Sequence, residues 1–225
     1  MSAFQPLCTA LTALSFFATA SFAAAQTPAP VPGGSAALEV VAFGDSLSAG
    51  YGVGPGEAFP DQLQAALKAK GYDVTVANAG VSGDTTTGGL ARLDWSVPET
   101  ADLVIVELGA NDALRGVSPG ITETNLDQIL ARLKERGTTT LLAGMIAPPN
   151  MGPDYSEAFN PIYARLAEKH DVPLYPFFLD GVASQADLNQ ADYMHPNAKG
   201  VAIVVERILP MVTEALDAVS AGPAG

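Results

Sequence analysis

Leu103-Val104-Ile105-Val106 is a run of four large aliphatic residues with no polar side chain among them. A β-strand points its side chains alternately to the two faces of a sheet, so an unbroken apolar run indicates that both faces are buried. Helices that cover both faces of a parallel sheet provide such burial. The run therefore predicts a central strand of an α/β domain.

Other segments on both sides of this run have the composition of strands, and segments of helical period separate them. The predicted strands are Leu38–Phe43, Val74–Ala77, Leu103–Leu108, Thr139–Met145 and Val172–Tyr175. Strands that alternate with helices through right-handed crossovers predict a single three-layer α/β/α domain. For five parallel strands we expect a flavodoxin-like strand order.

Apolar residues recur at helical spacing between these strands, which indicates helices with one buried face. The predicted buried faces are Phe59, Leu63 and Leu67; Leu126, Ile129, Leu130 and Leu133; Phe159, Ile162 and Leu166; and Val201, Val204, Val205, Ile208 and Val212. Pro210 is expected to kink the last helix near its end, because proline has no backbone N–H.

Residues 1–25 have the composition of a secretory signal peptide. They carry no charged side chain, have an apolar centre from Leu11 to Phe22 and end in alanines. A membrane-spanning helix is the alternative, but its Ser and Thr interruptions leave a short apolar core. Cleavage near Ala25 would place the protein in the periplasm or outside the cell. We then expect a disordered leader over 26–36.

The folded domain is expected over residues 37–217, with a flexible tail over 218–225. The net charge of −13 would repel phosphate backbones and anionic headgroups, so neither nucleic acid nor an acidic membrane surface is an expected partner. Stable membrane insertion is not expected either. The one cysteine, Cys8, lies within the predicted signal peptide. The mature protein would therefore have no disulfide and no thiolate ligand. We expect it to be a monomer.

Polar clusters follow three of the predicted strands and precede the last helix. Ser46, in Gly44-Asp45-Ser46-Leu47, follows the first strand, and the segments 78–87 and 109–112 follow the second and third. The segment 192–196 comes after the fifth strand. The carboxyl ends of parallel strands share one edge of the sheet, where ligands bind. These clusters together would supply a nucleophile, amide donors and a histidine with a carboxylate, as acyl transfer requires.

The two histidines of the chain have different surroundings. His170 ends an amphipathic helix, where an imidazole meets the helix dipole and solvent, so we interpret it as a surface residue. His195 stands three residues after Asp192, within reach for the carboxylate to accept its Nδ1–H. Nε2 would then be free to take the proton of Ser46. The alternative is a structural Asp–His pair that caps the last helix.

Asn111 and Gly83 are the candidate donors to an oxyanion. The side-chain amide of Asn111 can donate to a developing negative charge, which an ionised Asp112 cannot do. Gly83 has no side chain, so its N–H can approach the same point. The segment 82–89, rich in Gly and Thr, could instead cradle a phosphate. No lysine follows that segment and Asp84 lies inside it, which disfavours the phosphate interpretation.

Gly116-Val117-Ser118-Pro119-Gly120 matches the Gly-x-Ser-x-Gly pattern of a nucleophile elbow. That motif requires a strand directly before the serine and a helix directly after it. Here the polar residues 111–115 precede Ser118, and a proline and a glycine follow it. We interpret the segment as a loop that leads into a helix near Thr122.

Together these motifs resemble the SGNH hydrolase superfamily, also called GDSL esterases, over nearly all of residues 38–216. The matching blocks, in chain order, are Gly44-Asp45-Ser46-Leu47-Ser48, Gly80 with Ser82-Gly83-Asp84-Thr85, Gly109-Ala110-Asn111-Asp112 and Asp192-Tyr193-Met194-His195-Pro196. Residues 106–116, 150–155 and 158–160 are similar to the bacterial periplasmic thioesterase, lysophospholipase and arylesterase branch. That branch often has a glycine and an aliphatic residue where this chain has Tyr193 and Met194.

The resemblance implies that Ser46 is the nucleophile, His195 the general base and acid, and Asp192 the residue that orients His195. It also implies an oxyanion hole made by the backbone N–H groups of Ser46 and Gly83 and by the side chain of Asn111. The expected activity is hydrolysis of small-molecule acyl esters and acyl thioesters through an acyl-enzyme on Ser46. Neither a metal nor an organic cofactor is expected.

Two other functions are compatible with parts of the pattern. Related SGNH proteins remove acetyl groups from carbohydrates, but aromatic platforms for a sugar are scarce here, since the single tryptophan, Trp95, lies outside the motifs. A non-catalytic flavodoxin-like module could bind a phosphate or a flavin at the same edge of the sheet. Such a module would need neither Asp192 nor His195.

Overall fold

The computed structural model describes Met1 and residues 37–222. The predicted signal peptide, apart from Met1, and the whole of the predicted leader lie outside the described residues. The elements are β1 (Leu38–Gly44), α1 (Ser46–Ala49), α2 (Phe59–Ala69), β2 (Val74–Gly80), α3 (Thr86–Ser96), β3 (Leu103–Glu107), α4 (Ala110–Leu114), α5 (Pro119–Glu135), β4 (Thr139–Ala143), the 3-10 helix η1 (Pro149–Met151), α6 (Pro153–Phe159), α7 (Ile162–His170), β5 (Leu174–Tyr175) and α8 (Ala198–Ala221).

The five strands form one parallel sheet in the order β2-β1-β3-β4-β5. At the carboxyl end of β1, Gly44 pairs with Gly80 of β2 on one side and with Glu107 of β3 on the other. Strand order reverses between β1 and β3, and such a switch point is where ligands bind in open α/β sheets. The predicted flavodoxin-like α/β fold is confirmed.

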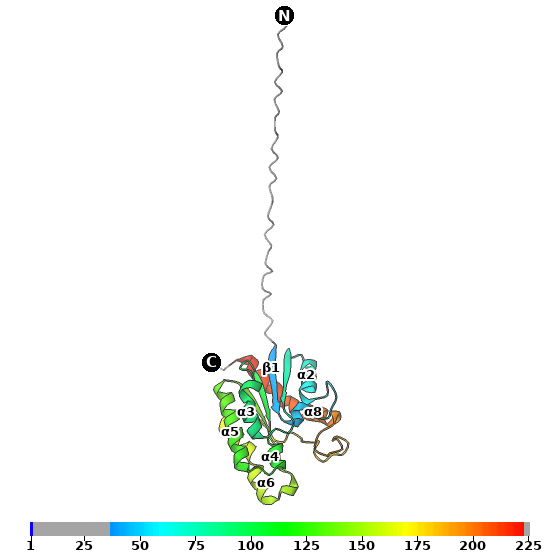
Figure 1. Ribbon diagram of the computed structural model, residues 1–225, viewed down its shortest axis with the longest axis vertical. Helices are drawn as coiled ribbons and strands as arrows, with labels where there is room; N and C mark the ends of the chain where they lie inside the picture. The colour runs from blue at the N-terminus through cyan, green and yellow to red at the C-terminus, as the bar shows by residue number, and fades with distance from the viewer. Residues whose placement is uncertain (2–36, 223–225) are drawn as a thin grey trace. The chain divides into compact units, whose positions relative to one another are not determined.

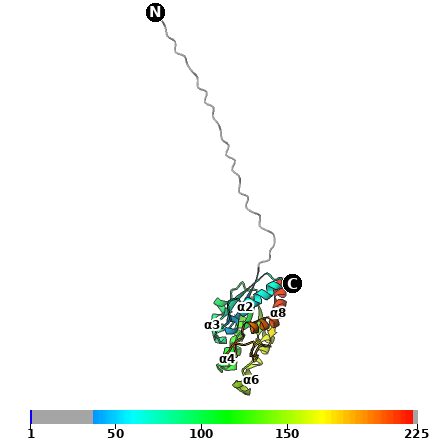
Figure 2. The ribbon, with the colours of Figure 1, turned by 90° about the vertical axis from the view of Figure 1, so that its right-hand side faces the viewer.

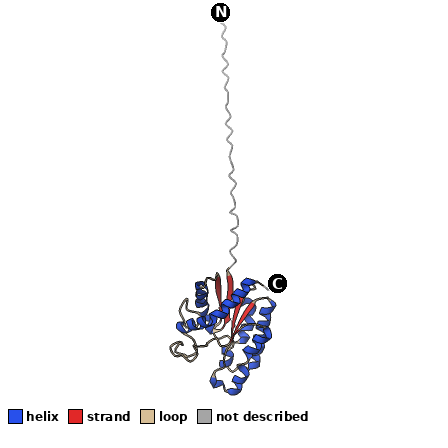
Figure 3. Cartoon of the chain, turned by 180° about the vertical axis from the view of Figure 1, so that it is seen from behind, coloured by secondary structure: helices blue, strands red, loops and turns tan. Residues whose placement is uncertain are grey.

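Helices cover both faces of the sheet. On one face α2 packs against α8, and on the other α5 packs against both α3 and α7. Figure 2 shows α2 and α8 turned toward the viewer, and Figure 3 shows the strands between helices from behind. Short α4 and α6 lie below the strands in Figure 1, beyond their carboxyl ends. This end of the sheet, called the carboxyl edge below, carries the candidate site.

The central strand is buried as its sequence predicts. Val104, Ile105 and Val106 have no exposed surface, and all five residues of β3 are buried. The predicted apolar faces of the helices are buried too, including Leu63, Leu67, Leu126, Ile129, Val204 and Ile208. Contact between the apolar helix faces and both sides of the sheet gives one continuous core.

The observed strands differ from the predicted ones at their ends. β2 continues to Gly80 because β1 continues to Gly44 and the two pair along their whole length. β3 and β4 stop at Glu107 and Ala143, before their predicted ends. β5 is reduced to Leu174–Tyr175, which pairs only with the last two residues of β4. A strand's exact end depends on its partner, which the apolar pattern of one segment does not reveal.

Phe159, Ile162 and Leu166, which were predicted to share one face of a single helix, lie in two helices. α6 ends at Phe159 and α7 begins at Ile162. Pro161 stands in the gap, where its missing N–H prevents one continuous ladder of hydrogen bonds. All three apolar residues are nevertheless buried, so the prediction of burial is confirmed while the prediction of a single helix is wrong.

Pro210 lies well inside α8 and not near its end. α8 continues to Ala221, into the segment 218–225 that was expected to be a tail. Ile208 and Val212, on either side of the proline, have no exposed surface, so packing of the apolar face holds the helix together there. In the part of the chain that the structure describes, no helix combines the length and the hydropathy needed to cross a membrane.

Candidate active site

Ser46 is the first residue of α1 and follows β1 after a single intervening residue, Asp45. The Asp45 side chain accepts the N–H of Leu47 at 3.0 Å and so caps the short helix. Leu47 and Ser48 are buried, whereas Ser46 itself is half-buried. The backbone at this turn is thus anchored in the core while the serine stays accessible at the carboxyl edge.

Ser46, His195 and Asp192 form a continuous chain of hydrogen bonds. The Oγ atom of Ser46 lies 2.9 Å from Nε2 of His195, and Nδ1 of the same ring lies 2.7 Å from Oδ2 of Asp192. An ionised carboxylate can only accept, so Nδ1 carries the proton and Nε2 is the acceptor for the serine hydroxyl. The sequence predicted these three residues, and the fold brings them together from both ends of the domain.

The Asp192 carboxylate is held by more than the histidine ring. Its Oδ1 atom accepts the backbone N–H groups of Met194 and His195, each at 3.0 Å. The hydrogen bond from the His195 ring, together with these two, lowers the pKa of Asp192 from 3.8 to about 2. The carboxylate therefore stays ionised at neutral pH and can stabilise a positive charge on the imidazole.

The loop that carries Asp192 and His195 is closed at its base by an antiparallel bridge between Asn189 and Pro196. Within it Tyr193 has φ 59°, in the left-handed region that favours glycine. The Tyr193 side chain is 71% exposed, so its bulk points to solvent.

Asn111 lies in the first turn of α4, after β3, and its side chain reaches back to the turn before Ser46. Its Nδ2 atom donates to Oδ2 of Asp45 at 2.9 Å. A primary amide has two N–H groups, so one can be anchored by Asp45 while the other remains available to an oxyanion. The structure thus assigns to Asp45 a role in holding Asn111 that the sequence did not reveal.

Gly83 follows β2 with φ 83°, a conformation that a side chain would disfavour. Its carbonyl oxygen accepts a hydrogen bond from Nη2 of Arg115, at the end of α4, over 2.8 Å. Among the described residues, the backbone N–H groups of Gly83 and of Ser46 donate to no protein acceptor. Both N–H groups are therefore available to a ligand at the carboxyl edge.

Two buried carboxyl groups lie beneath the Ser46 turn. Oε2 of Glu107, at the end of β3, accepts the hydroxyl of Ser48 at 2.8 Å and the N–H of Asp45 at 3.3 Å. Burial raises the pKa of Asp45 to about 6, and burial together with the nearby Asp45 raises that of Glu107 well above its usual range. Because two neighbouring buried negative charges are costly, Glu107 is the group that we assign as neutral.

Arg92, in α3, supports the carboxyl edge, a role that the sequence did not predict. The Arg92 guanidinium donates to the carbonyl oxygens of Gly44 and Ala79, each at 2.7 Å, and pairs with Asp84 at 2.6 Å. It thereby ties the ends of β1 and β2 to the following loop.

The two alternative candidates from the sequence, a phosphate-binding loop and a nucleophile elbow, do not have the structure that those functions require. Asp112 accepts the N–H and hydroxyl of Thr86, so the segment 82–89 does not form an open phosphate cradle. Ser118 is exposed and directly precedes α5, which begins at Pro119 and not near Thr122. Helix α4, and not a strand, comes before Ser118, so the elbow context is absent.

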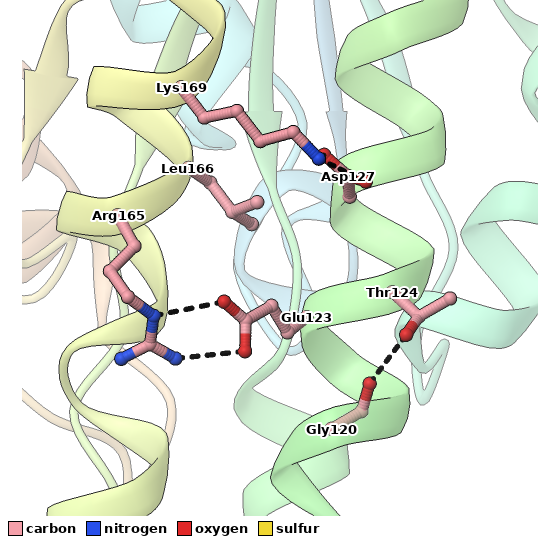
Figure 4. Close-up of a pocket in the computed structure, with 7 residues that line it drawn as sticks. All are labelled: Gly120, Glu123, Thr124, Asp127, Arg165, Leu166 and Lys169. Carbon is pink, nitrogen blue, oxygen red and sulfur yellow. Dashed lines mark hydrogen bonds and ion pairs between the residues drawn. The ribbon is translucent and has the colours of Figure 1, made fainter.

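His170 is buried, and its interpretation as a surface residue is wrong. Its side chain is only 8% exposed, and Nε2 lies 2.6 Å from Oδ1 of Asp127 in α5. The neighbouring Lys169 also bonds to Asp127, as Figure 4 shows. α5 covers the end of α7, which the pattern of α7 alone did not predict.

With this geometry in place, comparison with known proteins gives a consistent result. The sequence pattern of the GDSL-like lipase/acylhydrolase family matches residues 42–203, which is most of the chain. The chain belongs to this family. The match spans every residue of the Ser46, Asn111 and His195 arrangement, so the resemblance predicted from the motifs is confirmed.

The relatives of this GDSL-like acylhydrolase are named as ester and thioester hydrolases. An arylesterase of Vibrio mimicus is 41% identical over 76% of this chain and 86% of its own. The thioesterase 1/protease 1/lysophospholipase L1 of Escherichia coli is 43% identical over 72% and 77%. AlinE4, a solved SGNH-hydrolase family esterase, is 47% identical over 83% of this chain and 100% of its own, with a TM-score of 0.68. The predicted ester-hydrolase function is confirmed at this level.

Proposed function

We propose that this acylhydrolase cleaves acyl esters and acyl thioesters through an acyl-enzyme on Ser46, with His195 as general base and acid and Asp192 as its orienting partner. The observation that carries the proposal is the chain from Ser46 Oγ to His195 Nε2 at 2.9 Å and from His195 Nδ1 to Asp192 at 2.7 Å. Both distances are within the reach that proton transfer requires.

In the acylation step, Ser46 Oγ attacks the carbonyl carbon of the substrate while its proton passes to Nε2 of His195. The bond to the leaving oxygen or sulfur then breaks, and the same proton moves from Nε2 to the leaving group. In deacylation, a water molecule attacks the acyl-serine and gives its proton to Nε2. Collapse of the second tetrahedral intermediate returns that proton to Ser46 Oγ and releases the acid.

The negative charge on the tetrahedral intermediate would be stabilised by three donors: the backbone N–H groups of Ser46 and Gly83 and the side-chain amide of Asn111. The free state of both backbone N–H groups supports this assignment. The hydrogen bond from Asn111 to Asp45 also supports it, because that bond holds the amide at the carboxyl edge and leaves its second N–H available to the oxyanion.

Exposed apolar side chains around the carboxyl edge support an acyl substrate. Six of them lie in α4 or in loops at this end of the domain: Tyr51, Val81, Leu114, Ile146, Tyr193 and Met194. A contiguous exposed apolar patch marks a surface that contacts a ligand or partner, and each of these six side chains belongs to a segment that follows the carboxyl end of a strand. The names of the two relatives, an arylesterase and a thioesterase/lysophospholipase, agree with a substrate of this class.

A fluorophosphonate probe tests the proposal, because it reacts with activated serines. We expect mass spectrometry to locate the adduct on Ser46 and expect Ser46→Ala to be neither labelled nor active on a panel of acyl esters and thioesters of graded length. Labelling at another serine, or turnover by Ser46→Ala, would refute the assignment. Preferential hydrolysis of acetylated sugars, assayed beside that panel, would favour the deacetylase alternative.

We further propose that the protein is exported with cleavage near Ala25, on the basis of the uncharged, apolar composition of residues 1–25. N-terminal sequencing of the protein from a periplasmic or culture fraction would identify the cleavage site. An intact N-terminus on the fractionated protein would contradict the proposal. The expectation of a monomer stays a prediction, which light scattering of the purified enzyme can test.

A further inference from the structure

Gln190 connects the turn after Ser46 with the loop that carries His195. Its side-chain Nε2 donates to the carbonyl oxygen of Tyr51 at 2.7 Å and to that of Pro196 at 3.0 Å. Its backbone N–H donates to the carbonyl oxygen of His195 at 2.8 Å. One amide group therefore joins two segments that lie 139 residues apart in the sequence.

Tyr51, which Gln190 holds, contacts both Ser46 and His195. Its backbone N–H donates to the carbonyl oxygen of Ser46 at 3.1 Å, which ties it to the nucleophile. Its ring packs against the ring of His195, with 4.6 Å between the centroids. A shift of Tyr51 would consequently move the serine backbone and remove a support of the imidazole.

The turn after Tyr51 is shaped to receive the Gln190 amide. Gly52 has φ 73°, and a Cβ atom placed there would overlap the amide oxygen of Gln190. Gln190 is half-buried: its hydrogen bond to the Tyr51 carbonyl oxygen is exposed to solvent, and the one to the Pro196 carbonyl oxygen is partly buried. Loss of the donor would leave both carbonyl oxygens without this partner.

We propose that Gln190 is a positioning residue of the hydrolase. By holding the Tyr51 and Pro196 carbonyl oxygens on one nitrogen, it sets the distance and angle between Ser46 Oγ and His195 Nε2. It contacts neither of these reacting atoms itself. The inference rests on the proposed function, because only that function makes the Ser46–His195 contact a path for a proton.

Gln190→Met and Gln190→Glu are the informative variants. Methionine has a similar length but no donor, and glutamate keeps the size and polarity while turning an acceptor toward two carbonyl oxygens. We expect kcat to fall by about 10- to 100-fold in both, because small displacements of reacting groups have effects of this size. KM should change by no more than about twofold, since Gln190 does not contact the acyl group.

Gln185→Met is the matched control. Gln185 lies in the same loop and is exposed, and its side chain makes no hydrogen bond to any described residue. We expect kcat, KM and thermal stability to remain those of wild type. Active sites are counted by fluorophosphonate titration, so that each kcat refers to competent enzyme and not to total protein.

A role in positioning also predicts a slower reaction with the probe itself. The rate constant for labelling Ser46 should fall in Gln190→Met by about the same factor as kcat, since both need the Ser46–His195 contact. Wild-type kcat and labelling rate in Gln190→Met would overturn the proposal, as would a loss confined to stability or an equal loss in Gln185→Met. Failure of the probe to label wild-type Ser46 would instead refute the proposed function.

Discussion

The domain contains two Asp–His pairs with nearly the same geometry and different surroundings. His195 and Asp192 lie 2.7 Å apart at the carboxyl edge, and His170 and Asp127 lie 2.6 Å apart between α5 and α7. The His195 pair uses Nδ1 for the carboxylate and turns Nε2 to Ser46. The His170 pair uses Nε2 for the carboxylate, and Nδ1 of His170 has no hydrogen-bond partner among the described residues.

The charges around the two carboxylates differ as well. Asp127 also binds Lys169, and the neighbouring Arg165 forms a two-point pair with Glu123, as Figure 4 shows. These residues line a groove between α5 and α7, which is larger than the hollow beside Ser46. Every charged side chain that lines this α5–α7 groove is paired with one of opposite charge. Asp192, in contrast, has His195 as its only ionisable partner in the described part of the chain. An Asp–His pair suggests catalysis only when the second ring nitrogen faces a reactive group.

Replacing each histidine by glutamine is the strongest way to break this comparison. His195→Gln should lower kcat on the order of 10⁴-fold or more, because no base remains to accept the Ser46 proton. His170→Gln should leave kcat unchanged and lower the free energy of unfolding by about 1–3 kcal/mol, because a buried hydrogen bond to Asp127 is weakened. Steady-state kinetics and urea unfolding of both variants provide the measurement.

A comparable loss of kcat in both histidine variants, with both proteins folded, would contradict the assignment of the His170 pair as structural. Circular dichroism at the assay temperature distinguishes that result from unfolding of His170→Gln. Retention of activity in His195→Gln would remove the base from the proposed mechanism.

Asn111→Ala should have the next largest effect. The substitution removes one of the three proposed oxyanion donors, so we expect kcat to fall about 10²- to 10³-fold, with a smaller change in KM. Among the described residues, Lys169 is the further side chain that bonds to the side chains of the His170–Asp127 pair, and no side-chain amide does so. Kinetics of Asn111→Ala and Asn111→Asp give the test. Full turnover in Asn111→Asp would exclude the amide as a donor.

The sequence predicted those parts of the molecule that depend on local pattern. The apolar run at Leu103 identified the central strand, and the rarity of histidine led to His195 and its neighbour Asp192. Ser46 was found because a strand end places a serine at the carboxyl edge. These signals lie within a few residues of the feature that they predict, so no knowledge of distant contacts was needed.

The contacts that support the site are set by residues far apart in the chain, and the sequence did not predict them. Arg92 reaches Gly44 across 48 residues and Gln190 reaches Tyr51 across 139. Neither the residue type nor the local spacing predicts contacts across such distances in the sequence. The same limit explains the error at His170, because its burial comes from α5, an element distant in sequence.

Lowering the pH should reduce the contribution of both Asp–His pairs to the free energy of unfolding, so the two pairs can be compared by their stability. The His195 hydrogen bond lowers the pKa of Asp192 to about 2, and Lys169, followed by His170, lowers that of Asp127. A carboxylate with a lower pKa in the folded protein contributes stability that is complete above its unfolded pKa and is lost as the pH falls through the folded value. The stability difference between wild type and Asp192→Asn should therefore be constant above about pH 5 and vanish near pH 2.

The size of that contribution should be on the order of 1 kcal/mol or less, because both carboxylates are about one-third exposed and solvent screens them. Urea unfolding of Asp192→Asn and Asp127→Asn between pH 2 and pH 7 measures it. Only Asp192→Asn should also lose activity at neutral pH. A stability difference that grows as the pH falls would contradict the sign of the effect.

The smallest effect is expected at the Glu123–Arg165 pair, which has two hydrogen bonds of 2.9 and 2.8 Å between partly exposed side chains. Although Arg165 lowers the pKa of Glu123, a surface ion pair contributes little to the free energy of unfolding, because solvent screens it and two long side chains lose entropy. A double-mutant cycle with Glu123→Gln and Arg165→Met should give a coupling of about 0.2–1 kcal/mol that shrinks with added salt, and kcat should not change. A larger, salt-independent coupling would indicate that the groove is held together by its charges. A change in kcat would connect it to the carboxyl edge, and the contrast between the two Asp–His pairs would then fail.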